Sequence, residues 1–321
     1  MIMILIGMIT ILISIFKSRI GAVLLAAAVL TTACGDGGSG SDRLTVVATT
    51  SIWGDVVAGI VGDDAIVEVL IPRNTDAHDF QATSRQAASL LEADLVVANG
   101  LGLESGMGDV LESAESDGSN LLELAPMLDP LPFELAGDET GEHDHDELDP
   151  HVWFDPQRVA VAAELIADEL EAVDDSIDWT ARAGAYIDEV AVADEKIRDL
   201  LSSIPDDRRK LVTNHEALGY MADRYDLEIV GVVIPGGSTL ADPSSAELAE
   251  LVGIVDEEGV DVIFTETSQP SRLAEAVAAE IGRDIAIVAL FTESLGDPGT
   301  PAGTLVGMLV EDAKQISEAL G

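Results

Sequence analysis

Three of the five histidines in the sequence lie in short polar motifs. His78 belongs to TDAHDF, His151 to DPHVWFDP and His215 to TNHEA, and a glutamate, Glu293, lies in LFTESL near the end of the chain. Imidazole nitrogens and carboxylate oxygens are both ligands of divalent metal ions such as zinc. Because a single histidine is more often structural, the case for a metal site depends on the elements that carry these four residues.

The expected elements are parallel strands and helices. Short β-branched segments alternate with amphipathic ones along the chain, which predicts parallel sheets flanked by helices and hence an α/β fold with two lobes. The expected strands cover residues 44–49, 65–71 and 95–98 in the first lobe, and residues 211–213, 228–233, 260–265 and 285–290 in the second.

The candidate ligands follow predicted strands. His78 comes after the strand at 65–71, His215 directly follows the strand at 211–213, and Glu293 comes after the last predicted strand. Open α/β sheets form their ligand crevice at the carboxyl ends of strands. We therefore expect His78 and His151 from the first lobe to meet His215 and Glu293 from the second, with a cation between the lobes.

A long helix is predicted between the lobes. Apolar residues recur at alternating intervals of four and three over residues 179–204, which predicts a helix of about 39 Å at 1.5 Å per residue that spans both lobes and ends before Pro205. The predicted organisation is a signal peptide at 1–33, a lipidated cysteine with a flexible tether at 34–43, a first lobe at 44–177, a linking helix at 178–204 and a second lobe at 205–321.

The amino-terminal segment resembles a lipoprotein signal. A basic island at Lys17–Arg19 precedes a short apolar stretch, small residues and then Cys34, which is followed by a Gly/Ser-rich tether. We expect Cys34 to be lipidated and the protein to be anchored at the outer face of the cell membrane or to be periplasmic. The apolar segment before the island is explained either by a misassigned start codon or by an uncleaved membrane anchor. Because Cys34 is the only cysteine, no intrachain disulfide can form.

The strongly acidic composition argues against a nucleic-acid partner. The formal net charge is −44, and the 16 lysines and arginines are thinly scattered, whereas phosphate backbones require clustered basic residues. Solubility, adaptation to salt and attraction of divalent cations all remain explanations of this acidity.

One acidic segment is a candidate auxiliary metal-collecting loop. Residues 134–149 carry eight carboxylates together with His143 and His145, and no basic residue. Such a segment repels itself and lacks apolar anchors, which predicts a mobile loop. We expect His143 and His145 to collect zinc weakly near the main site.

Taken together, the motifs resemble those of the zinc- and manganese-binding substrate-binding lipoproteins of ABC importers. The resemblance covers about residues 44–321 and is carried by TTSIW, DAHDF, NGLGLE, DPHVW with its following DP, TNHEA with GY, and FTES. It implies two Rossmann-like lobes joined by one long helix, metal ligands at His78, His151, His215 and Glu293, and permease and ATPase subunits as partners.

The resemblance also bears on the acidic loop and has two departures. In the family, an acidic histidine loop before the second ligand is found mainly in zinc members. Many members have Asp at the position of Glu293, so the fourth ligand differs from the common pattern. The aromatic residue that often follows the NGLGLE motif is replaced here by Ser105 and Gly106.

Other functions fit the sequence less well than metal delivery. A zinc hydrolase is one alternative, but Gly219 stands where a zincin motif starting at His215 would need its second histidine. The glycines after Asn99 lack dinucleotide-binding spacing, and no Walker A motif is present, so ATP hydrolysis is assigned to a separate subunit. A surface adhesin is the third alternative, although aromatic residues are few. We expect a monomeric, non-enzymatic zinc carrier, with manganese as the alternative cargo.

Overall fold

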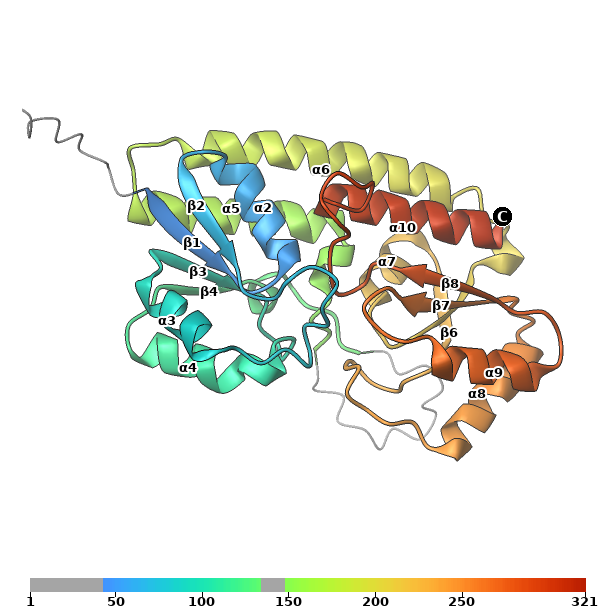
Figure 1. Cartoon of the computed structure of the whole chain (residues 1–321). Helices are drawn as coiled ribbons and strands as arrows, with labels where there is room; N and C mark the ends of the chain where they lie inside the picture. Colours follow the sequence, from blue (N-terminus) through green and yellow to red (C-terminus); the bar gives the residue numbers. More distant parts are fainter. Residues whose placement is uncertain (1–42, 134–147) are drawn as a thin grey trace, which may run out of the picture. The chain divides into compact units, whose positions relative to one another are not determined.

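The computed structural model describes residues 43–133 and 148–321 (Figure 1). The predicted signal peptide, Cys34, and His143 and His145 of the acidic loop lie outside these residues, so the expectations about them stay predictions. Among the described helices, none combines the length and apolar character needed to cross a lipid bilayer.

The first sheet consists of four parallel strands, shown in blue to green in Figure 1. β1 (Leu44–Ala48) lies between β2 (Ala65–Val69) and β3 (Leu95–Ala98), and β4 (Leu121–Glu123) pairs with β3. The three expected strands of this half are confirmed. β4 was not predicted, because a segment of three residues is too short to show a periodic pattern.

The second sheet repeats this arrangement. β5 (Lys210–Thr213) lies between β6 (Glu228–Val232) and β7 (Val262–Glu266), and β8 (Ala286–Leu290) pairs with β7, all in parallel. All four expected strands are present. The boundary of β7 differs, because the strand begins two residues later than the expected start at 260 and continues to Glu266.

Helices connect the strands of the first sheet, and local capping explains where several begin. α2 (Ser51–Val61) starts after Thr50, whose hydroxyl accepts a hydrogen bond from the Trp53 amide. α3 (Ser84–Glu92) starts with a capping box formed by Thr83 and Gln86. α4 (Gly108–Ser116) leads into β4. Short 3₁₀ helices lie at Ser105–Met107, Ala125–Met127 and Val152–Phe154.

Two long helices follow the first sheet. α5 (Pro156–Val173) is capped by Asp155, and α6 (Trp179–Leu201) contains 23 residues. α6 is the predicted linking helix, but it ends at Leu201 rather than at 204. Its last turn is closed by Ser202, and Ile204 stays buried beyond the end of the helix.

α6 is fastened to both halves of the chain. Near its start, Arg182 donates to the backbone carbonyl of Val61 at the end of α2 (2.8 Å). Further along, Asp194 pairs with Arg224 of α7 (Gly219–Tyr225). Its buried stripe packs against α2, α5 and the carboxy-terminal helix α10 (Leu305–Leu320).

The remaining helices cover the second sheet. A 3₁₀ turn at Asp206–Arg208 precedes β5, and α8 (Ser245–Glu257) and α9 (Arg272–Ile281) pack together against β6, β7 and β8. The main hydrophobic core includes residues of both sheets, α5, α6, α7 and α10, whereas a second, smaller core lies between the second sheet and α8 and α9. The two-lobe α/β fold is therefore confirmed, while the lobe boundaries expected at 177 and 205 stay predictions.

Candidate metal centre

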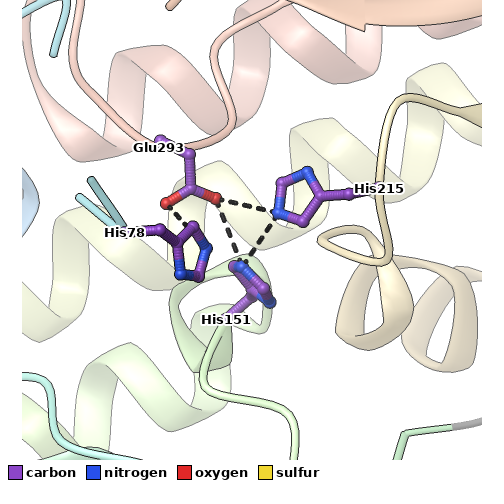
Figure 2. Close-up of side chains that lie close together, drawn as sticks. All are labelled: His78, His151, His215 and Glu293. Atoms are coloured by element: carbon purple, nitrogen blue, oxygen red, sulfur yellow. Dashed lines mark hydrogen bonds and ion pairs between the residues drawn. The ribbon is translucent and has the colours of Figure 1, made fainter. Parts of the chain in front are cut away.

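The four candidate ligands lie together in the structure (Figure 2). His78 comes from the loop between β2 and α3, His151 directly precedes the 3₁₀ turn before α5, His215 follows β5, and Glu293 follows β8. One ligand atom from each lies within 4.8 Å of the others, and all four residues are buried. Both predicted halves of the site thus meet at one point. That they bind a metal stays a prediction.

The spacing of these atoms matches a small tetrahedral ion. The Nε2 atoms of His151 and His215 are 3.2 Å apart, and they lie 3.2 and 3.3 Å from Oε1 of Glu293. Zinc bonds to nitrogen and oxygen are about 2.05 Å long, so the edge of a tetrahedron around zinc is about 3.3 Å. Nε2 of His78 lies 3.7 Å from the other Glu293 oxygen. The three distances among Nε2 of His151, Nε2 of His215 and Oε1 of Glu293 therefore already match the edge of a zinc tetrahedron.

The imidazole of His151 is oriented by Asp149. Oδ1 of Asp149 lies 2.7 Å from Nδ1 of His151 and also accepts a hydrogen bond from the His151 backbone amide (2.9 Å). A carboxylate on Nδ1 selects the tautomer that leaves Nε2 as the metal ligand. Asp149 is itself held, because Tyr220 donates its hydroxyl hydrogen to the Asp149 carbonyl (2.6 Å).

Glu266 has the same role for His215. Oε1 of Glu266, at the end of β7, is hydrogen-bonded to Nδ1 of His215, which directs Nε2 towards the centre. Glu266 is not among the residues predicted from the sequence to be functional. A position at the carboxyl end of a strand, the signal shared by His78, His215 and Glu293, also indicates Glu266, because it directly follows the predicted strand at 260–265.

Charge within the site is balanced by protonated imidazoles. Burial opposes a positive charge on His151, but the carboxylates of Asp149 and Glu293 raise the pKa of His151 to about 9. Burial also opposes a charge on His215, yet Glu266 and Glu293 raise the pKa of His215 well above its usual value. A metal ion must therefore displace protons from these nitrogens when it binds.

Glu293 faces the imidazoles of the site, and its carboxylate makes no hydrogen bond of good geometry. Burial acts to raise its pKa, but the neighbouring charges of His151 and His78 hold the pKa of Glu293 well below the usual value. Neither oxygen of its carboxylate has a hydrogen-bond partner, and Nε2 of His78 also has none. Buried polar atoms almost always have partners, so these orphaned atoms fit a cation at the centre.

The loop that carries Glu293 is bonded to the first lobe. The hydroxyl of Ser294 accepts a hydrogen bond from the backbone amide of Asn74 (2.7 Å) and lies 3.3 Å from the hydroxyl of Ser51. The Ser51 hydroxyl in turn accepts from the amide of Leu295 (3.2 Å). Although Glu293 follows a strand of the second sheet, its position is therefore set by contacts with both lobes.

Two charged residues of the first lobe extend this attachment. Arg73 donates to the carbonyls of Gly296 (2.6 Å) and Gly303 (2.9 Å). Asp55, on α2, accepts from the amide of Leu305 at the start of α10 (2.8 Å). The segment from Glu293 to α10 is thus fastened to the first lobe at both of its ends.

Hydrogen bonds between neighbours of the candidate ligands connect the two halves of the site and brace the first half. The indole of Trp153 donates to the carbonyl of Thr292 (3.1 Å), so it links the neighbours of His151 and Glu293. Asn99 donates to the carbonyl of Pro150 (2.9 Å) and accepts from the indole of Trp53 (2.9 Å). These contacts give a physical role to the TTSIW, NGLGLE and DPHVW motifs, which are linked to one another by hydrogen bonds.

Comparison with protein families identifies the group to which the chain belongs. The model of the family ZnuA, described as zinc-uptake complex component A, periplasmic, matches residues 46–319. The chain is a member of the ZnuA family. The resemblance noted in the sequence is therefore confirmed, and the match covers both lobes.

Individual relatives of this ZnuA-family protein carry names with different metals. It is 31% identical to the zinc-binding protein TroA of Treponema pallidum, over 95% of this chain and 99% of that protein. It is 30% identical to the manganese-binding lipoprotein MntA of Bacillus subtilis, with coverage of 95% and 99%. A solved structure, the periplasmic zinc binding protein TroA from Treponema pallidum, superposes with a TM-score of 0.79 at 28% identity, covering 87% of this chain and 99% of that one.

Proposed function

We propose that this ZnuA-family protein captures zinc outside the cytoplasm and delivers it to an ABC-type metal importer. The observation that supports this most directly is the buried set of three imidazoles and one carboxylate, with edges of 3.2 to 3.3 Å between three of its ligand atoms. A nitrogen-rich, four-coordinate set suits zinc, and the orienting carboxylates on two imidazoles raise their basicity as ligands.

Manganese is the alternative cargo, and one observation favours it. Both oxygens of Glu293 face the other candidate ligands and lack hydrogen-bond partners. A bidentate carboxylate raises the coordination number and adds oxygen ligands, which manganese prefers. The names of the relatives include both metals. Because zinc outcompetes manganese at most sites in a test tube, the cargo in the cell must be tested separately.

Binding rather than hydrolysis follows from the number of candidate ligands. Catalytic zinc sites commonly have three protein ligands and an open position for water, whereas His78, His151, His215 and Glu293 supply four. We therefore assign a transport role and no enzymatic activity. Delivery requires a permease and a separate ATPase subunit as partners.

Attachment to the membrane is proposed through Cys34. The basic island, the apolar segment and the tether motivate this proposal. Mass spectrometry of the membrane fraction should find a diacylated chain that begins at Cys34. A mature chain that retains residues 1–33 intact contradicts the proposal.

The acidic loop is proposed to collect zinc near the site. His143, His145 and the surrounding carboxylates attract cations weakly. Deleting residues 136–146 should leave the equilibrium affinity of the main site within about twofold and lower zinc uptake only when zinc is scarce. A large loss of affinity on deletion argues against an auxiliary role.

The proposed function is tested by measuring metal content and growth together. Native mass spectrometry with elemental analysis of protein purified from its own host should report one tightly bound zinc per chain. A strain that lacks the protein should need extra zinc for growth. Manganese in the purified protein, together with a manganese requirement in that strain, assigns manganese as the cargo instead.

A further inference from the structure

Asp76 lies two residues before the candidate ligand His78 and uses its two carboxylate oxygens differently. Oδ1 accepts a hydrogen bond from the backbone amide of His78 (2.8 Å). Oδ2 accepts hydrogen bonds from the hydroxyl of Thr239 and from the side-chain amide of Gln269. The Asp76 side chain is buried, so these bonds are shielded from water.

The two donors to Oδ2 belong to the other lobe. Thr239 lies in the loop that follows β6, and Gln269 lies in the loop that follows β7, whereas Asp76 follows β2 of the first sheet. Hydrogen bonds to a charged acceptor are about twice as strong as those between neutral groups. Asp76 therefore joins the backbone at His78 directly to two loops of the second lobe.

These contacts lie beside an opening that reaches the site. A cavity of about 370 Å³ is lined by His78, by Ser105 of the first lobe and by Gly237 and Ser238 of the second. Among the four candidate ligands, only His78 lines it. Because Gly237 and Ser238 directly precede Thr239, the hydrogen bond from Thr239 to Asp76 holds one wall of the cavity in place.

Gly237, in the same wall of the cavity, lies close to an apolar side chain. A methyl group placed on Gly237 would lie 1.8 Å from the ring of Phe133, so only glycine allows this approach. Phe133 also lines the cavity. The loop after β6 is thus held on one side by Asp76 and on the other by Phe133.

We propose that Asp76, Thr239 and Gln269 are positioning residues that control how fast metal leaves the site through the cavity beside His78. This inference rests on the proposed metal-binding function. Breaking the cross-lobe hydrogen bonds frees the loop wall and loosens the Asp76 side chain, which holds the His78 amide through its other oxygen. The ligand set is unchanged by such a break, so the main effect falls on the rate of release.

The test measures zinc release into excess chelator by stopped-flow. Thr239→Val and Gln269→Leu remove one donor each while they keep most of the side-chain volume. Each should raise the dissociation rate constant about tenfold, as expected for the loss of one hydrogen bond to a charged group, while the association rate constant changes less than about threefold. The double variant should release zinc faster than either single variant.

Matched controls are available on the surface. Thr180→Val on α6 and Gln157→Leu on α5 make the same chemical changes at exposed positions, and neither should alter release. Unchanged release in both Thr239→Val and Gln269→Leu overturns the proposal. Weaker affinity that arises only from slower association also overturns it, because the residues would then shape the site before binding rather than retain the metal.

Hydrogen exchange separates this proposal from the proposed function. Without added metal, the His78 amide and the loop at 236–240 should exchange faster in both variants than in the unaltered protein. If the unaltered protein binds neither zinc nor manganese, the proposed function fails, and the retention role fails with it even where exchange changes as expected. If it binds zinc and the variants release it normally, only the retention role fails.

Discussion

The Nε2 atoms of His151 and His215 lie 3.2 Å apart although the two residues are 64 positions apart in the sequence. His151 belongs to the segment before α5, and His215 follows β5 of the second sheet. Each imidazole has a carboxylate on its Nδ1 atom, so the facing Nε2 atoms are left for a shared partner. The cation that we propose for this site lies between them and joins the two lobes.

Replacing either histidine should disable the site. We expect His151→Ala or His215→Ala to weaken zinc affinity by about two orders of magnitude or more, because each removes one of four ligands and leaves a buried carboxylate unpaired. Glu293→Ala should cost less, since water can take the vacated position. Competition titration against a zinc chelator measures both. Glu195→Ala on the exposed face of α6 is the control, and near-native affinity in either histidine variant refutes a site shared between the lobes.

Glu266 should matter for affinity although it is not a candidate ligand. Glu266→Ala should weaken zinc binding by about 10- to 100-fold, because His215 loses the group that orients its ring. Glu266→Gln keeps an acceptor for Nδ1 and should recover part of this loss. The same titration tests both variants, with Glu250→Ala on α8 as an exposed control. Equal affinities for the Ala and Gln variants would mean that orientation through this hydrogen bond is unimportant.

Ser294 should act through the position of Glu293. Ser294→Ala removes the acceptor of the Asn74 amide and the contact with Ser51, so the loop carrying Glu293 loses attachment to the first lobe. We expect about a three- to tenfold loss of zinc affinity, in keeping with one lost hydrogen bond. Amide exchange at Asn74 should accelerate in the same variant. Ser203→Ala at an exposed position is the control. If amide exchange at Asn74 accelerates but zinc affinity is unaltered, the attachment of the Glu293 loop does not influence metal binding.

Asp312 makes stability depend on pH. Its side chain is fully buried in α10, one oxygen accepts from the Phe291 amide (3.0 Å), and the other has no partner. Burial raises the pKa of Asp312 well above its usual value. Between the unfolded and the folded pKa the folded state binds more protons, so this residue lowers the free energy of unfolding as pH rises through that window.

Asp312→Asn should remove this effect. At pH 7 the variant should be more stable by roughly 1–3 kcal/mol, because the buried aspartate must take up a proton on folding, at about 1.4 kcal/mol per pH unit above its unfolded pKa, whereas asparagine is already neutral. The difference should shrink as pH falls towards the unfolded pKa of the aspartate. Urea denaturation at pH 7 and pH 5 measures the difference. Asp199→Asn, at an exposed position of α6, is the control. If Asp312→Asn is less stable than the unaltered protein at pH 7, this account is wrong.

Local sequence patterns predict part of the fold but not all of it. The strands that begin at Leu44 and Leu95 were recognised because they are continuous apolar segments, which is typical of parallel sheets with helices on both faces. β4 is too short to produce such a pattern. It forms because its residues pair with the edge of β3. The predicted helix extended to 204 because Ile204 continues the apolar stripe, yet Ile204 is buried by tertiary packing after the helix has ended.

The sequence by itself determined the α/β class, the long helix and the identity of the four candidate ligands. Each of these follows from residue type and local spacing: apolar periodicity, strand ends and polar motifs. Only the tertiary structure decided that Glu266 orients His215, that Asp76 reaches Thr239 and Gln269, and that the Glu293 loop is bonded to Ser51 and Arg73. These contacts join residues far apart along the chain, and hydrogen bonds depend on distances of about 3 Å that no local pattern specifies.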